Sequence, residues 1–204
     1  MNGVRIKICG LFRREDAQAV NAAMPDYAGF VFYAKSRRNV DLALALALRA
    51  ALHPDIRTVG VFVNAPVENI ADLYAGGVIS IAQLHGTENN GYIDTLRKRC
   101  PVMEIWQAFR IRSRDDLAIA AQSTADCVLL DGGAGDGRAF DWSLADGFPR
   151  PFILAGGLTP ETIPDAVRRL HPFAVDLSSG VETDGVKDAQ KIAAAVHAAR
   201  RATP

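Results

Sequence analysis

The stretch Arg5-Ile-Lys-Ile-Cys-Gly10 is the first apolar run of the chain and has the pattern of a β-strand. Its isoleucines alternate with polar residues, and the glycine then ends the strand. Because successive side chains of a strand point to opposite faces, Lys7 and Cys9 share the face away from the isoleucines. A thiol at the last position of a strand lies where parallel α/β proteins place their functional groups. The stretch therefore predicts a strand that ends in a candidate functional cysteine, although buried cysteines that only pack are also common.

The same strand signal recurs along the chain and alternates with helical patterns. Further strands are expected over residues 27–33, 57–63, 78–84, 102–109, 126–131, 151–155 and 173–177. Helices are expected over residues 13–23, 42–52, 67–74, 90–99, 114–122, 159–170 and 186–201, with at most one helical turn in 140–148. Eight such alternations with short connections predict an α/β fold, a single (β/α)₈ TIM barrel domain over residues 1–204. An open flavodoxin-like sheet is the alternative, but it would use about five units.

Composition excludes several classes of protein. The chain has 204 residues, and its 23 basic and 23 acidic residues cancel, so no overall field draws it to nucleic acid or an anionic membrane. No apolar run approaches a membrane span, and the N-terminus lacks the profile of a signal peptide. The three cysteines, at positions 9, 100 and 127, suit a reducing compartment and show no zinc-binding spacing. We expect a cytoplasmic globular protein.

A barrel of this kind carries its site at the C-terminal ends of its strands. Glycines and serines follow the seventh and eighth expected strands, where backbone N–H groups can hold a phosphate. These candidate phosphate-binding residues are Gly156, Gly157, Ser178, Ser179 and Gly180. The alternative is that the glycines only make tight turns. The run from Gly132 to Gly137 is too glycine-rich for a helix or strand, and we expect a mobile loop there.

Cys9 and Asp131 end the first and sixth strands, so they can face each other across a bound ligand. Burial can raise the pKa of a carboxyl group so that it serves as an acid, while a thiolate serves as a base. A strand-end aspartate can also cap a turn, but the pair favours catalysis. Lys7 should point inward with Cys9, and a buried ammonium needs a partner such as Asp176.

Other polar residues lie at the ends of the second and fourth strands. Gln83 and His85 are expected to contact a substrate from the fourth. Arg37 and Arg38 follow the second, where a guanidinium group can hold a carboxylate or phosphate in a bidentate manner. We expect Arg37 to be a solvated loop residue.

Taken together, these segments resemble the phosphoribosylanthranilate isomerase family, the (β/α)₈ enzymes of the tryptophan pathway. The resemblance runs nearly end to end and rests on KICG at 7–10, GFVF at 29–32, SRR at 36–38, GVFVN at 60–64, QLHG at 83–86, LLDGG at 129–133, FDW at 140–142, LAGGL at 154–158, DLSSGVE at 176–182 and GVKD at 185–188. It implies an Amadori rearrangement of N-(5′-phosphoribosyl)anthranilate to 1-(2-carboxyphenylamino)-1-deoxyribulose 5-phosphate, without a metal or another cofactor.

The resemblance also implies residue roles. Asp131 would be the general acid that opens the ribose ring, and Cys9 the general base that removes the C2′ proton. Arg38 would hold the anthranilate carboxylate, Asp176 would contact the substrate, and the glycine–serine loops would hold the phosphate. The chain departs from the family pattern at Phe12, Arg37 and Ala134, which usually read Thr, Pro and Thr, and these changes bear on affinity and loop behaviour.

Other functions stay open at this point. The histidine-pathway sugar isomerase shares the fold and the chemistry, but that family carries an aspartate where this chain has Cys9. Activity on a related phosphorylated aminosugar is another possibility, and so is a catalytically inactive barrel that binds phosphosugars. The only partner expected is a small-molecule substrate, with no nucleic acid or membrane. A monomer is expected, with a homodimer as the alternative.

Overall fold

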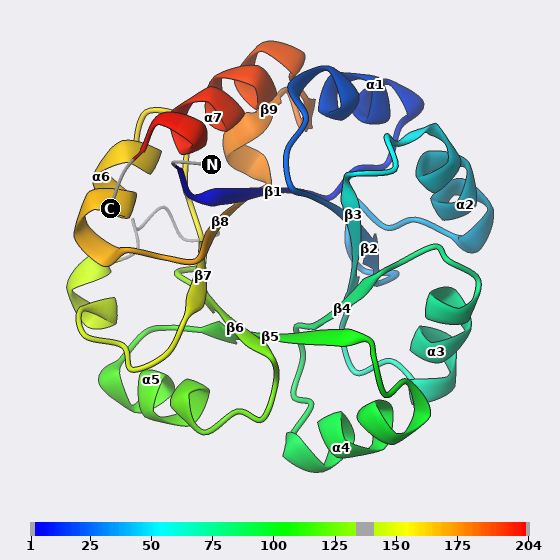
Figure 1. Cartoon of the computed structure of the whole chain (residues 1–204), viewed down its shortest axis with the longest axis horizontal. Coiled ribbons are helices and arrows are strands. Elements are labelled where there is room, and N and C mark those ends of the chain that lie inside the picture. Colours follow the sequence, from blue (N-terminus) through cyan, green and yellow to red (C-terminus); the bar gives the residue numbers. More distant parts are fainter. Residues whose placement is uncertain (1–2, 134–140, 203–204) are drawn as a thin grey trace.

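The structure is a computed structural model that describes residues 3–133 and 141–202. Eight parallel strands close into a barrel in chain order, with the helices outside it (Figure 1). The strands are β1 (Arg5–Cys9), β2 (Tyr27–Phe32), β3 (Arg57–Phe62), β4 (Ile81–Leu84), β5 (Glu104–Arg110), β6 (Cys127–Asp131), β7 (Phe152–Ala155) and β8 (Ala174–Leu177). Each overlaps its predicted range. The predicted (β/α)₈ barrel is therefore confirmed.

The outer layer consists of α1 (Arg14–Ala23), α2 (Leu42–Ala51), α3 (Val67–Ala75), α4 (Asn90–Arg99), α5 (Arg114–Ala121), α6 (Ile163–Leu170) and α7 (Ala189–Arg201). Between β6 and β7 the described residues contain only the short 3₁₀ helix η1 (Trp142–Ala145), in agreement with the single turn expected there. Polar side chains cap the N-termini of α2, α4, α5 and α7. Asp41, for example, caps α2 by accepting a hydrogen bond from the backbone N–H of Leu44 at 2.8 Å. Of the predicted helices, α4 has the bounds expected from the sequence.

Two helices begin three or more residues later than predicted. The segment from Thr159 forms its own hydrogen-bonded turn, in which Thr162 donates to the carbonyl of Thr159, so α6 begins only at Ile163. Before α7 the chain makes an antiparallel hairpin of β9 (Glu182–Thr183) and β10 (Val186–Lys187). The two turn residues, Asp184 and Gly185, have φ angles of 51° and 81°, the left-handed conformation that hairpins of two turn residues require. Val186 and Lys187 thus belong to the hairpin and not to the helix.

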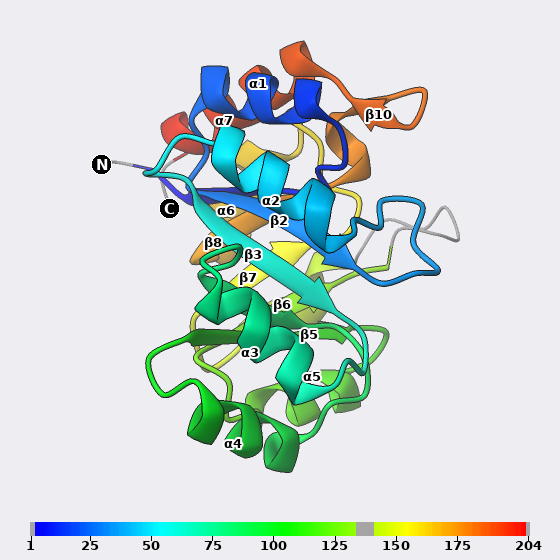
Figure 2. The ribbon, with the colours of Figure 1, turned by 90° about the vertical axis from the view of Figure 1, so that its right-hand side faces the viewer.

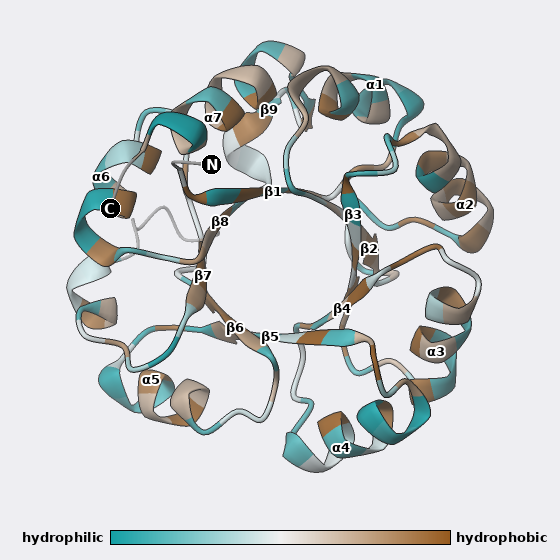
Figure 3. Ribbon diagram, in the orientation of Figure 1, coloured by the Kyte–Doolittle hydropathy of each residue, from teal (hydrophilic) through white to brown (hydrophobic). Residues whose placement is uncertain are grey.

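Strand alternation divides the core into two layers. One face of each strand packs against the helices, and the other fills the barrel interior with Tyr27, Val59, Ile81, Trp106, Leu129, Ile153 and their neighbours. Tyr27 and Trp106 meet edge to face there, with ring centroids 5.0 Å apart. Figure 3 shows brown along most of the strands and teal segments on the outer helices. The interior is therefore packed, and space for a ligand opens only at its end.

The order and direction of the strands indicate which end of the barrel holds the candidate site. Figure 2 shows β2 and β3 side-on, with their arrowheads pointing to the end of the barrel where the β10 hairpin also lies. The loops after all eight parallel strands meet at this end. Among the described residues, no helix combines the length and apolar character needed to span a membrane.

Candidate active site

A pocket of about 510 Å³ lies at the C-terminal end of the barrel. Residues from the ends of seven of the eight strands, or from the loops after them, line it. All of the predicted site residues are among them, namely Cys9, Arg38, Gln83, His85, Asp131, Gly156, Gly157, Asp176, Ser178, Ser179 and Gly180. The structure therefore brings the predicted set together in one place, while their roles remain predictions.

Cys9 is a buried thiol at the end of β1, opposite Gly29 of β2. A Cβ at Gly29 would lie 2.9 Å from the Cys9 sulfur and 3.2 Å from the Lys7 Cε, so the absent side chain makes room for both groups. Burial raises the pKa of Cys9, and the nearby Lys7 opposes that shift without cancelling it. The thiol is thus the stable form in the ligand-free protein, and Lys7 favours the thiolate.

Lys7 is completely buried and donates a hydrogen bond from Nζ to Asp176 Oδ2 at 2.7 Å. The predicted partner of Lys7 is therefore confirmed. Burial lowers the pKa of Lys7, but Asp176 and Cys9 outweigh burial, and the net shift is upward, so Lys7 is an ammonium ion. Two other oxygens of the described residues, Asp176 Oδ1 and Gln83 Oε1, are buried without a hydrogen-bond partner. Since a buried acceptor without a partner is costly, these two oxygens are ready to accept from a ligand.

Asp131, at the end of β6, lies beside His85, with the His85 Nε2 atom 3.4 Å from Asp131 Oδ2. It also accepts a hydrogen bond from the backbone N–H of Gly133 at 2.9 Å. Burial raises the pKa of Asp131, but the contacts with His85 and Gly133 outweigh it, and the pKa lies below its ordinary value. The expectation that burial would raise this pKa is wrong for the ligand-free protein, because two donors stabilise the carboxylate.

Arg38 lines the pocket and binds Glu182, a residue that the sequence did not single out. Arg38 Nε donates to Glu182 Oε1 at 2.7 Å, and a second guanidinium N–H donates to Oε2 at 2.8 Å. The Arg37 side chain is 56% exposed, as expected for a solvated loop, but it also contacts Glu182 at 2.6 Å. Lys187 reaches the same carboxylate at 2.7 Å. A local signal, the Asp184-Gly185 turn, could have predicted the hairpin that carries Glu182 and Lys187.

The loops after β7 and β8 form another part of the pocket lining. Gly156 and Gly157 have φ angles of 92° and 69°, which few other residues adopt, and a Cβ at Gly180 would lie 1.8 Å from the Leu158 carbonyl oxygen. Ser179 begins the 3₁₀ helix η2 (Ser179–Val181). Close backbone approach with exposed N–H groups suits a phosphate. Most of the glycine-rich loop, including Ala134, lies outside the described residues.

The described residues contain no group of three or more His, Cys, Asp or Glu side chains arranged to hold a metal ion. The polar residues of the pocket instead offer a thiol, a carboxylate with a histidine beside it, a guanidinium group and a glycine–serine wall. Such a set can move protons on a bound anion.

The sequence pattern of one family, described as N-(5′phosphoribosyl)anthranilate (PRA) isomerase, matches residues 6–198. The N-(5′-phosphoribosyl)anthranilate isomerase of Endomicrobium trichonymphae is 46% identical over 195 residues, which cover 92% of this chain and 94% of that protein. The corresponding protein of Thermoanaerobacter sp. (strain X514) is 41% identical over 196 residues, with 93% and 94% covered.

Solved structures agree with the sequence relatives. The phosphoribosyl anthranilate isomerase from Thermotoga maritima superposes with a TM-score of 0.87 at 35% identity, covering 96% of this chain and 98% of that one. A phosphoribosyl anthranilate isomerase solved with reduced 1-(o-carboxyphenylamino)-1-deoxyribulose 5-phosphate has a TM-score of 0.84 at 35% identity, with the same coverage. The chain belongs to the N-(5′-phosphoribosyl)anthranilate isomerase family.

Proposed function

We propose that Cys9 and Asp131 are the base and the acid with which this tryptophan-pathway isomerase converts N-(5′-phosphoribosyl)anthranilate to 1-(2-carboxyphenylamino)-1-deoxyribulose 5-phosphate. The observation that carries the proposal is that strands β1 and β6 aim these two groups into the same pocket. General acid and base groups must be within reach of one substrate, and two strands separate β1 from β6 on one side of the barrel.

The reaction is a series of proton transfers in three steps. Asp131 donates a proton to the ribose ring oxygen, and the bond between that oxygen and C1′ breaks as the anilino nitrogen forms an iminium ion. The Cys9 thiolate then removes the proton from C2′, which the iminium has acidified, and an enolamine results. The enol hydroxyl at C2′ loses its proton as C1′ gains one, which gives the ketone. C2′ is oxidised from an alcohol to a ketone and C1′ is reduced by the same two electrons, so no external oxidant or reductant is needed and substrate and product are isomers.

In the ligand-free protein the protonation states of Cys9 and Asp131 are the reverse of those that the reaction needs. In the ligand-free protein Cys9 favours the thiol because burial raises its pKa, whereas Asp131 favours the carboxylate. A bound substrate excludes water from Asp131 and competes with His85 for the Asp131 carboxylate oxygen, and both effects raise the pKa of Asp131. Lys7 continues to stabilise the Cys9 thiolate. The proton on the pair is thereby shifted toward Asp131 when substrate is bound.

The remaining residues suit the two ends of the substrate. Arg38 would bind the anthranilate carboxylate, and the wall of Gly156, Gly157 and the 178–180 segment would bind the phosphate. The unpartnered acceptors Gln83 Oε1 and Asp176 Oδ1 would accept hydrogen bonds from ribose hydroxyls between these ends. His85, which lies beside Asp131, would also contact the substrate.

The experiment that tests this function follows the anthranilate fluorescence of freshly made N-(5′-phosphoribosyl)anthranilate with wild type and Cys9→Ala. Rapid decay with wild type and none with the variant is expected. No decay with wild type would refute the function, and decay with Cys9→Ala at the wild-type rate would refute the base assignment.

The assembly and location of the protein are also part of the proposal. One similar structure is that of monomers generated from the dimeric phosphoribosylanthranilate isomerase of Thermotoga maritima. For this chain we keep the expectation of a cytoplasmic monomer that binds a small-molecule substrate. Light scattering during size exclusion would show a dimer instead if the expectation is wrong.

A further inference from the structure

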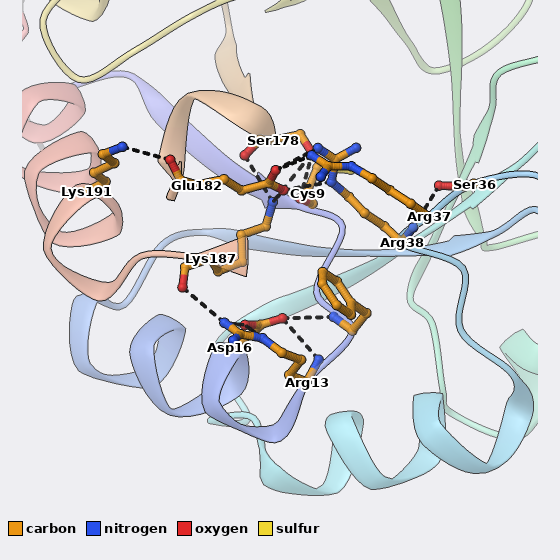
Figure 4. A network of polar contacts seen from close by, with 11 residues as sticks. Cys9, Arg13, Asp16, Ser36, Arg37, Arg38, Ser178, Glu182, Lys187 and Lys191 are labelled. Atoms are coloured by element: carbon orange, nitrogen blue, oxygen red, sulfur yellow. Dashed lines mark hydrogen bonds and ion pairs between the residues drawn. The ribbon is translucent and has the colours of Figure 1, made fainter. Parts of the chain in front are cut away.

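Glu182 is a buried carboxylate on which three cationic side chains converge from different parts of the chain. Its side chain is 4% exposed and contacts Arg37, Arg38 and Lys187 at distances of 2.6–2.7 Å. Figure 4 shows these contacts beside Cys9 and Ser178. No step of the proposed reaction uses Glu182, although Arg37 and Arg38 line the pocket and Lys187 contacts Ser178, which also lines it.

The contact with Arg38 fixes the orientation of its guanidinium group. Glu182 accepts one hydrogen bond from Nε and one from a terminal nitrogen, at 2.7 and 2.8 Å. A guanidinium group has five N–H donors, so three of them are not used by Glu182. The stem of Arg38 crosses Gly10, where a Cβ would lie 2.4 Å from the Arg38 Cδ. Glu182 thus holds one edge of the Arg38 guanidinium group, and Gly10 leaves room for the aliphatic stem. The other edge of the guanidinium group can bind a carboxylate in the pocket.

The contact with Lys187 extends the connection to the loop after β8. Lys187 is buried and donates from Nζ to Glu182 Oε1 at 2.7 Å and to the Ser178 carbonyl at 3.0 Å. The Ser178 hydroxyl in turn donates to the carbonyl of Cys9 at 3.1 Å. A single chain of contacts therefore joins Arg38, Glu182, Lys187, Ser178 and the strand end that carries the thiol.

The hairpin that carries Glu182 is itself held firmly. Lys191 on α7 donates to the backbone carbonyl of Glu182 at 2.7 Å. Arg13, which is fixed by Asp16 at 2.7 Å, donates to the carbonyl of Lys187 at 3.1 Å. Both strands of the hairpin are thereby attached to the helical layer. A side chain on such a support can set the position of others.

We propose that Glu182 is a positioning residue that aligns Arg38 for the substrate carboxylate and, through Lys187, aligns Ser178 beside the phosphate. One carboxylate then sets the relative position of the two anion sites of the pocket. This inference rests on the proposed function, because it takes Arg38 and the 178–180 segment as those two sites.

The charges of the cluster are consistent with this role. Three cations surround one carboxylate, so the cluster keeps a surplus of two positive charges beside the pocket. Glu182 thus orients the guanidinium group without cancelling the attraction for a substrate that carries two anionic groups. A carboxylate that merely neutralised a buried arginine would not need the two other cations.

The test compares wild type with Glu182→Gln, and uses Glu68→Gln, an exposed residue of α3, as the matched control. Glutamine keeps the size of the side chain but removes its charge and one acceptor. We expect KM for N-(5′-phosphoribosyl)anthranilate to rise at least about tenfold, as for a lost buried charge contact, with kcat within about threefold. In the Arg38→Ala background the same change should raise KM by less, since only the effect that passes through Lys187 remains. Equal effects in both backgrounds, or an unchanged KM, would overturn the proposal.

Two further measurements separate this outcome from poor folding and from a wrong function. Arg37→Ala removes an exposed partner and should raise KM only about two- to fivefold at an unchanged melting temperature. Inorganic phosphate, titrated by calorimetry, should bind more weakly to Glu182→Gln than to wild type, whether or not the wild type turns over the substrate. Equal phosphate affinity in a folded Glu182→Gln variant would overturn the connection through Lys187, while absent turnover by wild type would refute only the proposed function.

Discussion

The ammonium nitrogen of Lys7 lies 2.7 Å from Asp176 Oδ2, one alternation before Cys9 on the inner face of β1. The same cation therefore pairs with a carboxylate and lies beside the thiol. Burial raises the pKa of Cys9, and Lys7 lowers it. In this barrel an ion pair that looks purely structural therefore also influences the pKa of the proposed base.

Lys7→Met should shift the pH dependence of the reaction. Activity requires the thiolate, so it rises with pH through the pKa of Cys9. Without Lys7 that pKa moves higher, and kcat/KM near pH 7 should fall about tenfold for each unit of the shift. The loss should shrink at higher pH in a profile of kcat/KM against pH.

Stability needs a separate control in that experiment. Removing Lys7 leaves the Asp176 carboxylate buried without its partner, which costs about 3–5 kcal/mol of unfolding free energy. The assay therefore belongs well below the melting temperature, with the exposed Lys98→Met as the matched variant. A profile of unchanged shape, merely scaled down, would contradict the electrostatic role of Lys7.

Asp131→Asn should abolish most turnover while retaining binding. Asparagine preserves the shape of the side chain but cannot donate an acid proton, and a general acid contributes about 10²–10⁴-fold to the rate. Stopped-flow fluorescence gives kcat, and equilibrium titration with the product gives its affinity, which should stay within about threefold. Asp115→Asn, on the exposed side of α5, is the control. Near-normal kcat in Asp131→Asn would remove this residue from the acid role.

Arg38→Ala should raise KM and leave kcat largely intact, because the carboxylate contact is the same in the ground state and the transition state. Hydrogen bonds to a charged group are worth about 1.5–3 kcal/mol, which corresponds to roughly a 10- to 100-fold rise in KM. Initial rates over a range of substrate concentrations measure it, with the exposed Arg114→Ala as the control. An unchanged KM would place the carboxylate elsewhere in the pocket.

The barrel and its site were predictable because both follow from local patterns. Alternation along each strand decides which side chains face inward, and it places Cys9 and Asp131 at the same end of the barrel. It also makes Lys7 an inward-facing cation, and the search for a partner then leads to Asp176. Such inferences need only the strand register and the rule that parallel strands share an end.

What the sequence did not yield depends on contacts between distant residues. The largest contribution that lowers the pKa of Asp131 comes from His85, in the loop after β4, and no local pattern reports that their side chains meet. Glu182 and Arg38 are 144 positions apart, so their pairing is visible only in three dimensions. The late start of α7 is different, since the Asp184-Gly185 turn and the Asp188 cap are both local signals.

The Glu182 cluster should also make the protein sensitive to acid. Burial raises the pKa of Glu182, but Arg38 and Lys187 outweigh it and lower the pKa from 4.5 to about 2. Because the folded-state pKa is the lower one, this carboxylate stabilises the fold fully above pH 4.5, and the contribution is lost as the pH falls toward about 2. Urea unfolding of wild type and Glu182→Gln at about pH 6 and about pH 3.5 should therefore show a difference in unfolding free energy that shrinks at the lower pH. Glu68→Gln should show no such change, and a constant difference between wild type and Glu182→Gln would mean that the carboxylate is not held ionised by its cations.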